Sequence, residues 1–118
     1  MTKILVVDDA VFMRMRCTKV LKDNNYETVE AGNGIEALKQ YQEQKPDAVL
    51  MDITMPDMDG IETLKKLMEI DSSARIAMVT AMGQQSLVIE ALKAGAKDFV
   101  VKPFNAERIL AAVQKITG

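Results

Sequence analysis

Acidic residues follow two apolar segments of the sequence, at positions where a β-strand would end. Asp8 and Asp9 come directly after the apolar run 4–7, and Asp52 comes directly after the equally apolar run 48–51. Two unit charges about 4 Å apart repel by about 4 kcal/mol at an effective dielectric of 20, so three converging carboxylates would need a counterion. A hard divalent cation such as Mg²⁺ prefers oxygen ligands and would meet that need. These three residues therefore form a candidate metal site.

Lys102 and Thr80 also follow apolar segments and would complete such a site. Lys102 would bring an ammonium group to it, and Thr80 a hydroxyl. Each residue alone also has an ordinary explanation, because an Asp-Asp pair often caps a turn or a helix and a lysine at a strand end is commonly solvated. Three carboxylates, a lysine and a hydroxyl at strand ends together form a candidate site for phosphoryl transfer.

The elements that would carry these residues alternate between short apolar runs and helical patterns, which is typical of an α/β protein with a parallel sheet. The runs 4–7, 48–51 and 76–79 are continuously apolar, as expected of strands covered by helices on both faces. The segments 28–31 and 99–101 are weaker strands, expected nearer the edges. In such a sheet the carboxyl ends of the central strands meet at a crevice, which is where ligands bind.

Spaced apolar residues and polar caps predict the helices between these strands. Asn33 with Glu36 three residues later forms a capping box, Asn105 is the expected cap of the last helix, and Gly95 ends the helix before it. The five helices are marked by the stripe Met13, Cys17, Val20 and Leu21, by Ala37, Leu38 and Tyr41, and by the segments 61–70, 87–94 and 109–116.

Composition narrows the possible functions. The 118 residues fit one domain, and 15 basic against 17 acidic residues leave a net charge of −2, which offers little attraction for nucleic acid or an anionic membrane. The single cysteine, Cys17, excludes an intrachain disulfide, and no apolar run reaches membrane-spanning length. We expect a soluble, cytoplasmic, monomeric protein that acts on a protein partner or a small ligand.

Five motifs in a fixed order resemble the receiver domains of response regulators, and the match covers essentially the whole chain. The resemblance implies one receiver domain over residues 1–118 with a flavodoxin-like (βα)5 fold. In that fold a five-stranded parallel sheet has the order 2-1-3-4-5 and carries helices on both faces. The motifs are VVDDA at 6–10, MDITMPDMDG at 51–60, VTAMG at 79–83, AGAKDF at 94–99 and VKPF at 101–104.

The resemblance also implies a role for each member of the acidic site. Asp52 would be the nucleophile that accepts a phosphoryl group as an acyl phosphate. Asp8 and Asp9 would bind Mg²⁺ together with Asp52, and the backbone carbonyl of Thr54 would complete the protein's share of ligands. Thr54 and Met82 would flank the path of attacking water and set the lifetime of the phosphate.

A switch beside the site is implied in the same way. Lys102 would pair with one phosphoryl oxygen, and Thr80 would move inward to donate a hydrogen bond to another. That motion would vacate a space for Phe99, whose alternative is an ordinary core side chain. Val88 is expected to be exposed beside Phe99 as a partner contact. The bond between Lys102 and Pro103 is expected to be cis.

The chain would be a phosphoryl acceptor and not a turnover enzyme. It contains no histidine, so a phosphohistidine donor must be a separate histidine kinase, expected to be the chemotaxis kinase. The segments DDAVFMR at 8–14 and AMGQQSLVIEALKAGAKDF at 81–99 resemble the stand-alone chemotaxis members, whose partner is the flagellar motor switch. A phosphatase partner is left open.

Three alternatives are weighed against this reading. A phosphorelay carrier or another stand-alone receiver would keep the same acidic site. The segment 49–54 also resembles the haloacid-dehalogenase phosphatases, but Thr54 stands where they have a general acid, which removes their proton donor. A flavodoxin-like FMN carrier would share the layered fold, but Asp8 and Asp9 would repel the FMN phosphate.

Overall fold

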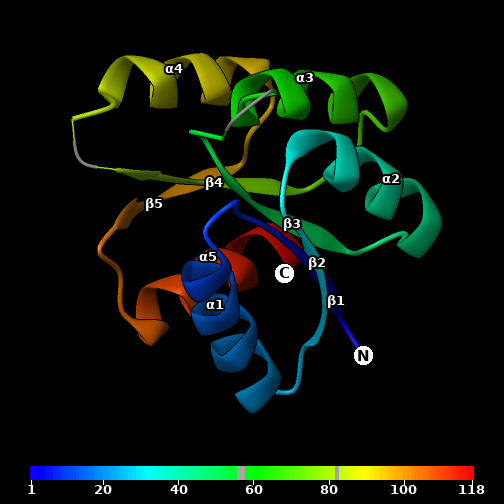
Figure 1. The fold of residues 1–118 in the computed structure, drawn as a ribbon, viewed down its shortest axis with the longest axis vertical. Coiled ribbons are helices and arrows are strands. Elements are labelled where there is room, and N and C mark those ends of the chain that lie inside the picture. Colours follow the sequence, from blue (N-terminus) through cyan, green and yellow to red (C-terminus); the bar gives the residue numbers. More distant parts are fainter. Residues whose placement is uncertain (56–57, 82) are drawn as a thin grey trace.

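A parallel sheet of five strands lies between two layers of helices (Figure 1). The computed structural model describes residues 1–55, 58–81 and 83–118. The strand order is β2-β1-β3-β4-β5, as predicted. The strands are β1 Lys3–Val7, β2 Glu27–Ala31, β3 Ala48–Asp52, β4 Ile76–Ala81 and β5 Asp98–Lys102, and the helices are α1 Val11–Asp23, α2 Gly34–Gln44, α3 Gly60–Ile70, α4 Gln85–Ala94 and α5 Ala106–Thr117.

The apolar strands are buried on both faces, because successive side chains of a strand point to opposite sides. Leu5 and Val7 of β1 pack on the side that α2, α3 and α4 cover, whereas Ile4 and Val6 pack on the side of α1 and α5. Figure 1 shows the same two layers above and below the sheet. Since both faces of the central strands are covered, polar side chains that follow these strands gather at the edge where the strands end.

Polar side chains cap three of the five helices. Asn33, Asp59 and Asn105 each accept a hydrogen bond from the backbone N–H three residues on, at the starts of α2, α3 and α5. The caps predicted at Asn33 and Asn105 are therefore confirmed. Gly95 ends α4 with φ at +122°, a conformation that favours glycine. Helix α4 has no side-chain cap of its own, although Gln84 occupies the capping position.

The winding of the chain reverses at the middle of the sheet. From β1 the chain first adds β2 on one side and then β3 on the other, so α1 leaves β1 toward one face and the chain after β3 leaves toward the other. This is the place where open α/β sheets form a ligand crevice. None of the helices that the structure describes combines the length and the apolar character required to cross a bilayer.

Candidate functional site

Carboxylates from two neighbouring strand ends converge at the middle of the sheet. Val7 of β1 lies beside Met51 of β3, so the residues that end or follow these strands are also neighbours. One carboxylate oxygen from each of Asp8, Asp9 and Asp52 lies within 4.8 Å of the others. Asp8 and Asp52 are buried and Asp9 is exposed, which leaves the cluster open to solvent on one side. Such a set of oxygen ligands fits a hard divalent cation.

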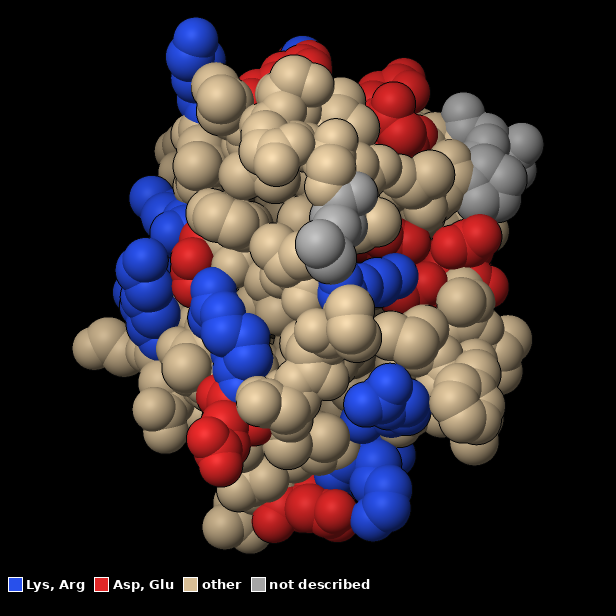
Figure 2. Space-filling model, turned by 90° about the vertical axis from the view of Figure 1, so that its left-hand side faces the viewer, with Lys and Arg blue, Asp and Glu red and all other residues tan. Residues whose placement is uncertain are grey.

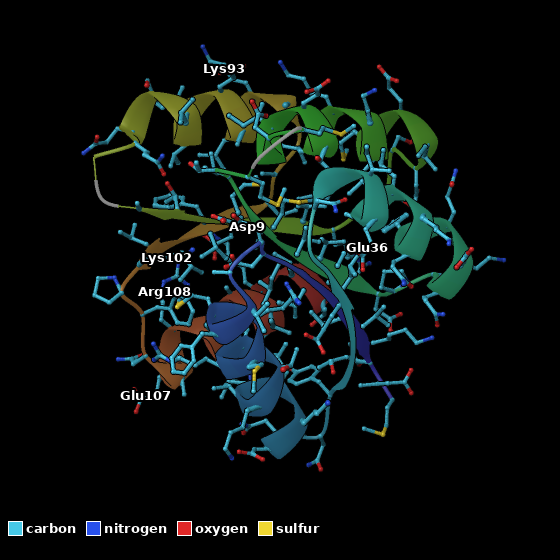
Figure 3. The ribbon with its side chains drawn as sticks, viewed as in Figure 1. Asp9, Glu36, Lys93, Lys102, Glu107 and Arg108 are labelled. Atoms are coloured by element: carbon cyan, nitrogen blue, oxygen red, sulfur yellow. The ribbon has the colours of Figure 1, made fainter. Side chains whose placement is uncertain are left out.

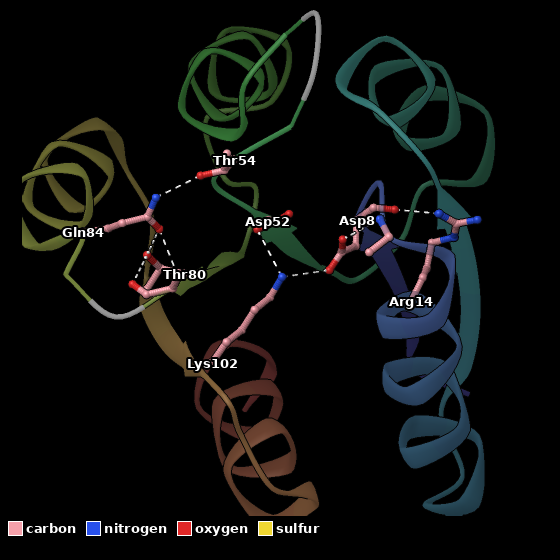
Figure 4. Close-up of polar contacts among 9 residues, drawn as sticks. Asp8, Arg14, Asp52, Thr54, Thr80, Gln84 and Lys102 are labelled. Atoms are coloured by element: carbon pink, nitrogen blue, oxygen red, sulfur yellow. Dashed lines mark hydrogen bonds and ion pairs between the residues drawn. The ribbon is translucent and has the colours of Figure 1, made fainter.

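Lys102 reaches this cluster from the end of β5, two strands away from β3. Its Nζ lies 3.3 Å from an oxygen of Asp8 and 3.6 Å from an oxygen of Asp52 (Figure 4). Figure 3 shows Lys102 and Asp9 at the same edge of the sheet, while Lys93 on α4 points away from it. The bond between Lys102 and Pro103 is cis, as the resemblance implies. One ammonium group thus faces three carboxylates, and a bound divalent cation would balance the negative charge that remains.

Burial and charge shift the ionisation of the two partners in this contact. Burial, together with the charge of Asp8, raises the pKa of Asp52 to about 6, and Lys102 offsets part of that rise. For Lys102, burial lowers the pKa, but the attraction of Asp52 and Asp8 outweighs burial, so that its pKa is raised. Asp52 is therefore ionised and Lys102 protonated at neutral pH, and the carboxylates repel one another until a cation is bound.

Arg14 holds the backbone of the cluster in place, a role that the sequence did not reveal. Its Nη1 donates a hydrogen bond of 2.6 Å to the backbone carbonyl of Asp8, and its Nε lies 3.0 Å from Glu30 on β2. The side chain of Asp8 also accepts a hydrogen bond from the backbone N–H of Ala10. Asp8 is thus fixed through both its main chain and its side chain, which reduces the entropy lost when a ligand binds.

The hydroxyl groups near the site are joined by a third side chain. Thr80, at the end of β4, is 1 % exposed, and its hydroxyl lies 2.6 Å from Oε1 of Gln84. The Nε2 of Gln84 donates to the hydroxyl of Thr54 at 3.0 Å (Figure 4). The hydrogen bonds of Thr80 therefore run toward α4. Gln84 was not singled out from the sequence, and its only signal there is a polar residue at the helix start.

The loop after Asp52 depends on a glycine. The backbone N–H of Gly60 donates to the carbonyl of Ile53 at 2.7 Å, and a Cβ on Gly60 would lie 2.0 Å from the carbonyl oxygen of Asp52. Only glycine fits at that distance. The prediction made for Met82 falls on a residue outside the described part of the chain.

An apolar groove lies next to the site, between α4 and β5. Phe99 is half-buried, whereas Val88 is only 9 % exposed and belongs to the core under α4, so the prediction that Val88 is exposed is wrong. Val88 lies on the same helical face as the buried Ala91, while Ile89 and Leu92 are exposed beside it. The groove has a volume of about 400 Å³, and its lining includes Thr80, Gln85, Val88, Ile89, Leu92 and Phe99.

The neighbourhood of the groove carries charge of both signs. Figure 2 views the side of the molecule on which α4 begins and β5 ends, and basic and acidic side chains meet there around an uncharged area. The site and the groove share Thr80, which contacts Gln84 and also lines the groove. A change at the acidic cluster that moved Thr80 would therefore alter the groove.

Comparison with known proteins identifies the family. Residues 4–114 match the response regulator receiver domain. The chain belongs to that family. This receiver is 58 % identical over 114 residues to the chemotaxis protein CheY of Bacillus subtilis, an alignment that covers 96 % of this chain and 95 % of that protein. It is 55 % identical over 116 residues to the chemotaxis protein CheY of Listeria monocytogenes, with 98 % of both chains covered.

A solved complex adds a structural relative of the receiver. The structure of a CheX-CheY-BeF3-Mg²⁺ complex from Borrelia burgdorferi contains a chain that is 37 % identical to this one, with a TM-score of 0.93. The match covers 99 % of this receiver and 90 % of that chain. The predicted family and fold are thereby confirmed, and the dehalogenase-type and flavodoxin-type alternatives are set aside.

Proposed function

We propose that this receiver is a stand-alone response regulator of chemotaxis, a single domain over residues 1–118 whose Asp52 accepts a phosphoryl group from a separate histidine kinase. The observation that carries the proposal is the contact of Lys102 with both Asp8 and Asp52, at 3.3 and 3.6 Å. This contact puts the ammonium group of Lys102 beside the buried carboxylate of Asp52, which lies close to the carboxylates of Asp8 and Asp9. Its chemotaxis relatives, similar over nearly the whole chain, support the same assignment.

In the proposed site, Asp8, Asp9, Asp52 and the backbone carbonyl of Thr54 would hold Mg²⁺. The bound ion would neutralise the charge that develops on the phosphoryl oxygens. The three convergent carboxylates support this ligand set. Arg14 would keep the main chain of Asp8 fixed while the ligand shell forms, since it donates to that carbonyl.

Asp52 and Lys102 have different roles in the proposed transfer step. An oxygen of the ionised Asp52 attacks the phosphorus of the phosphohistidine, forming an O–P bond while the P–N bond breaks and its electron pair returns to the donor imidazole. Because its pKa is about 6, most of Asp52 is in the nucleophilic form at neutral pH. The ammonium group of Lys102 pairs with a phosphoryl oxygen and stabilises its charge. The chain thus accepts a phosphoryl group and is not a turnover enzyme.

The signal leaves through the apolar groove. Thr80 donates a hydrogen bond from its hydroxyl to the phosphoryl group, Phe99 moves with it, and the groove changes shape for a protein partner, which we take to be the flagellar motor switch. The exposed Ile89 and Leu92 offer the contacts that were first assigned to Val88. That the protein works in the cytoplasm and as a monomer is part of the same proposal.

The decisive experiment measures phosphate incorporation from acetyl phosphate by intact mass. The wild type should gain one phosphoryl group only when Mg²⁺ is present, and Asp52→Asn should gain none. Asp23→Asn is the matched control, because Asp23 is an exposed aspartate at the end of α1 that pairs with Lys19, away from the acidic site. Equal labelling of wild type and Asp52→Asn would remove Asp52 from its assigned role.

A further inference from the structure

The side chain of Gln84 joins the two loops that border the acidic site. Its Oε1 lies 2.6 Å from the hydroxyl of Thr80 and 3.0 Å from the backbone N of Ala81, and its Nε2 lies 3.0 Å from the hydroxyl of Thr54. The backbone N–H of Ala81 can only donate, so the atom that faces it must be the amide oxygen. The orientation of the amide is therefore fixed, and Figure 4 shows both threonines on it.

The hydroxyl of Thr80 has a single hydrogen, for which its possible acceptors must compete. A threonine hydroxyl carries one hydrogen, and an amide oxygen can only accept. The hydrogen of Thr80 is therefore directed at Gln84, with the carbonyl of Ala81 at 3.2 Å as its other acceptor. The proposed function needs the same hydrogen on a phosphoryl oxygen. Thr80 cannot donate it to both partners at once.

We propose that Gln84 is a positioning residue that holds the receiver in its resting state by competing with the phosphoryl group for the hydroxyl of Thr80. This inference rests on the proposed function and adds a regulating residue to it. Through Nε2 the same amide ties Thr54 on the β3 side to Thr80 on the β4 side. Phosphorylation must break one of these contacts before Thr80 can turn inward.

The start of α4 couples this contact to the groove. Gln84 precedes the first residue of α4, and its side chain crosses to the two threonines in place of capping the helix. Gln84 itself lines the groove, and so do Gln85 and Val88 of α4. Release of Gln84 therefore frees the end of the helix on which the groove is built.

The chain supplies its own control for a test. Gln114 is an exposed glutamine on α5 that does not line the groove. Gln114→Ala removes the same chemical group but leaves the contacts of Gln84 with Thr54 and Thr80 intact. Gln84→Met keeps the length of the side chain without its polar atoms, which guards against an effect of lost packing alone.

The experiment measures the affinity for beryllium fluoride, a phosphoryl mimic, by titration calorimetry at saturating Mg²⁺. A net hydrogen bond typically contributes about 0.5–1.5 kcal/mol, so Gln84→Ala and Gln84→Met should bind the mimic roughly 2- to 10-fold more tightly than wild type. Gln114→Ala should match wild type. The affinity for Mg²⁺ alone should stay unchanged in all three variants, because Gln84 contacts the hydroxyl of Thr54 and not the backbone carbonyl that would bind the ion.

A double-mutant cycle with Thr80→Val tests the assigned partner. When the hydroxyl is absent, Gln84→Ala should no longer change the affinity for the mimic. A gain that persists in the Thr80→Val background would overturn the inference, as would an affinity for Gln84→Ala that is equal to or weaker than that of wild type. If the wild type itself fails to bind the mimic, the proposed function fails and takes this inference with it.

Discussion

The ammonium group of Lys102 lies 3.3 Å from a carboxylate oxygen of Asp8, although 94 positions separate the two residues in the sequence. The contact spans the sheet from β5 to β1, and Lys102 also reaches Asp52 at 3.6 Å. A cation that binds to these carboxylates must share them with Lys102. The lysine therefore opposes metal binding in the resting receiver, although in the proposed function it would stabilise the phosphoryl group.

Replacing this lysine should separate the two effects. We expect Lys102→Met to bind Mg²⁺ about tenfold more tightly, because a fixed positive charge about 3–4 Å from two metal ligands is removed. Phosphorylation by acetyl phosphate should slow at the same time. Calorimetric titration of Mg²⁺ and the intact-mass assay measure the two quantities. Lys97→Met is the control for loss of one exposed lysine, and an unchanged Mg²⁺ affinity in Lys102→Met would contradict the prediction.

The raised pKa of Asp52 predicts how the stability of the metal-free receiver depends on pH. Between 3.8 and about 6 the folded state holds a proton on Asp52 that the unfolded state has released. The free energy of unfolding should therefore fall as pH rises through this window, by on the order of 2 kcal/mol from this group. Urea unfolding in the presence of a chelator, repeated across the window, measures the fall.

Asp52→Asn should remove that part of the pH dependence. The variant carries no charge to be buried beside Asp8, so its free energy of unfolding at neutral pH should exceed that of the wild type by about 1–2 kcal/mol. It should therefore unfold at a higher urea concentration. Below pH 3.8 the two proteins should converge. Saturating Mg²⁺ should narrow the gap at neutral pH, since the ion binds only the folded wild-type site tightly. A variant that is less stable than wild type without metal would contradict the assignment.

Arg14 offers a test of main-chain positioning that leaves every carboxylate in place. Arg14→Met removes the donor to the carbonyl of Asp8, so Mg²⁺ should bind roughly 3- to 10-fold more weakly. Glu30→Gln is the matched control, because it removes the charge that pairs with Arg14 but keeps the bond to Asp8. If Glu30→Gln weakens Mg²⁺ binding as much as Arg14→Met does, the effect arises from the ion pair and not from the carbonyl.

The close approach of Gly60 to Asp52 predicts a steric penalty. Gly60→Ala would place a methyl group 2.0 Å from the carbonyl oxygen of Asp52, so the loop must shift; we expect a loss of about 2–3 kcal/mol in stability and slower phosphorylation. Gly32→Ala serves as the control, because the nearest atom to its new methyl group lies 3.5 Å away. Thermal unfolding of the two variants should differ clearly.

Much of the fold could be predicted because its signals are local. Continuous apolar runs marked the strands, Asn33 and Asn105 marked two helix starts, and the rule that parallel strands end at one edge brought Asp8 and Asp52 together. Helix α4 shows where such signals stop. Val88, Ile89 and Leu92 are all apolar. The pattern could not decide which of them faces the core, and Val88 was assigned to the wrong side.

Contacts between loops could not be predicted from the sequence for a different reason. The bonds of Gln84 to Thr54 and Thr80 form only after two loops from separate strand–helix units have been brought side by side. The bond from Arg14 to a main-chain carbonyl carries no information about the identity of the residue that it contacts. Such contacts depend on tertiary geometry, and residue types and spacing do not specify them.

The start of α4 lacks a side-chain cap because the residue at that position, Gln84, makes contacts elsewhere. Helices α2, α3 and α5 are each closed by a side chain of their own capping residue, whereas the side chain at the start of α4 is fastened to the ends of two strands. The side chain that could cap the first turn of α4 thus binds residues beside the acidic site instead of the helix's own backbone. In the proposed function, a phosphoryl group on Asp52 would draw Thr80 away from Gln84 and release the first turn of α4, so the change would reach the groove that Thr80 and α4 line.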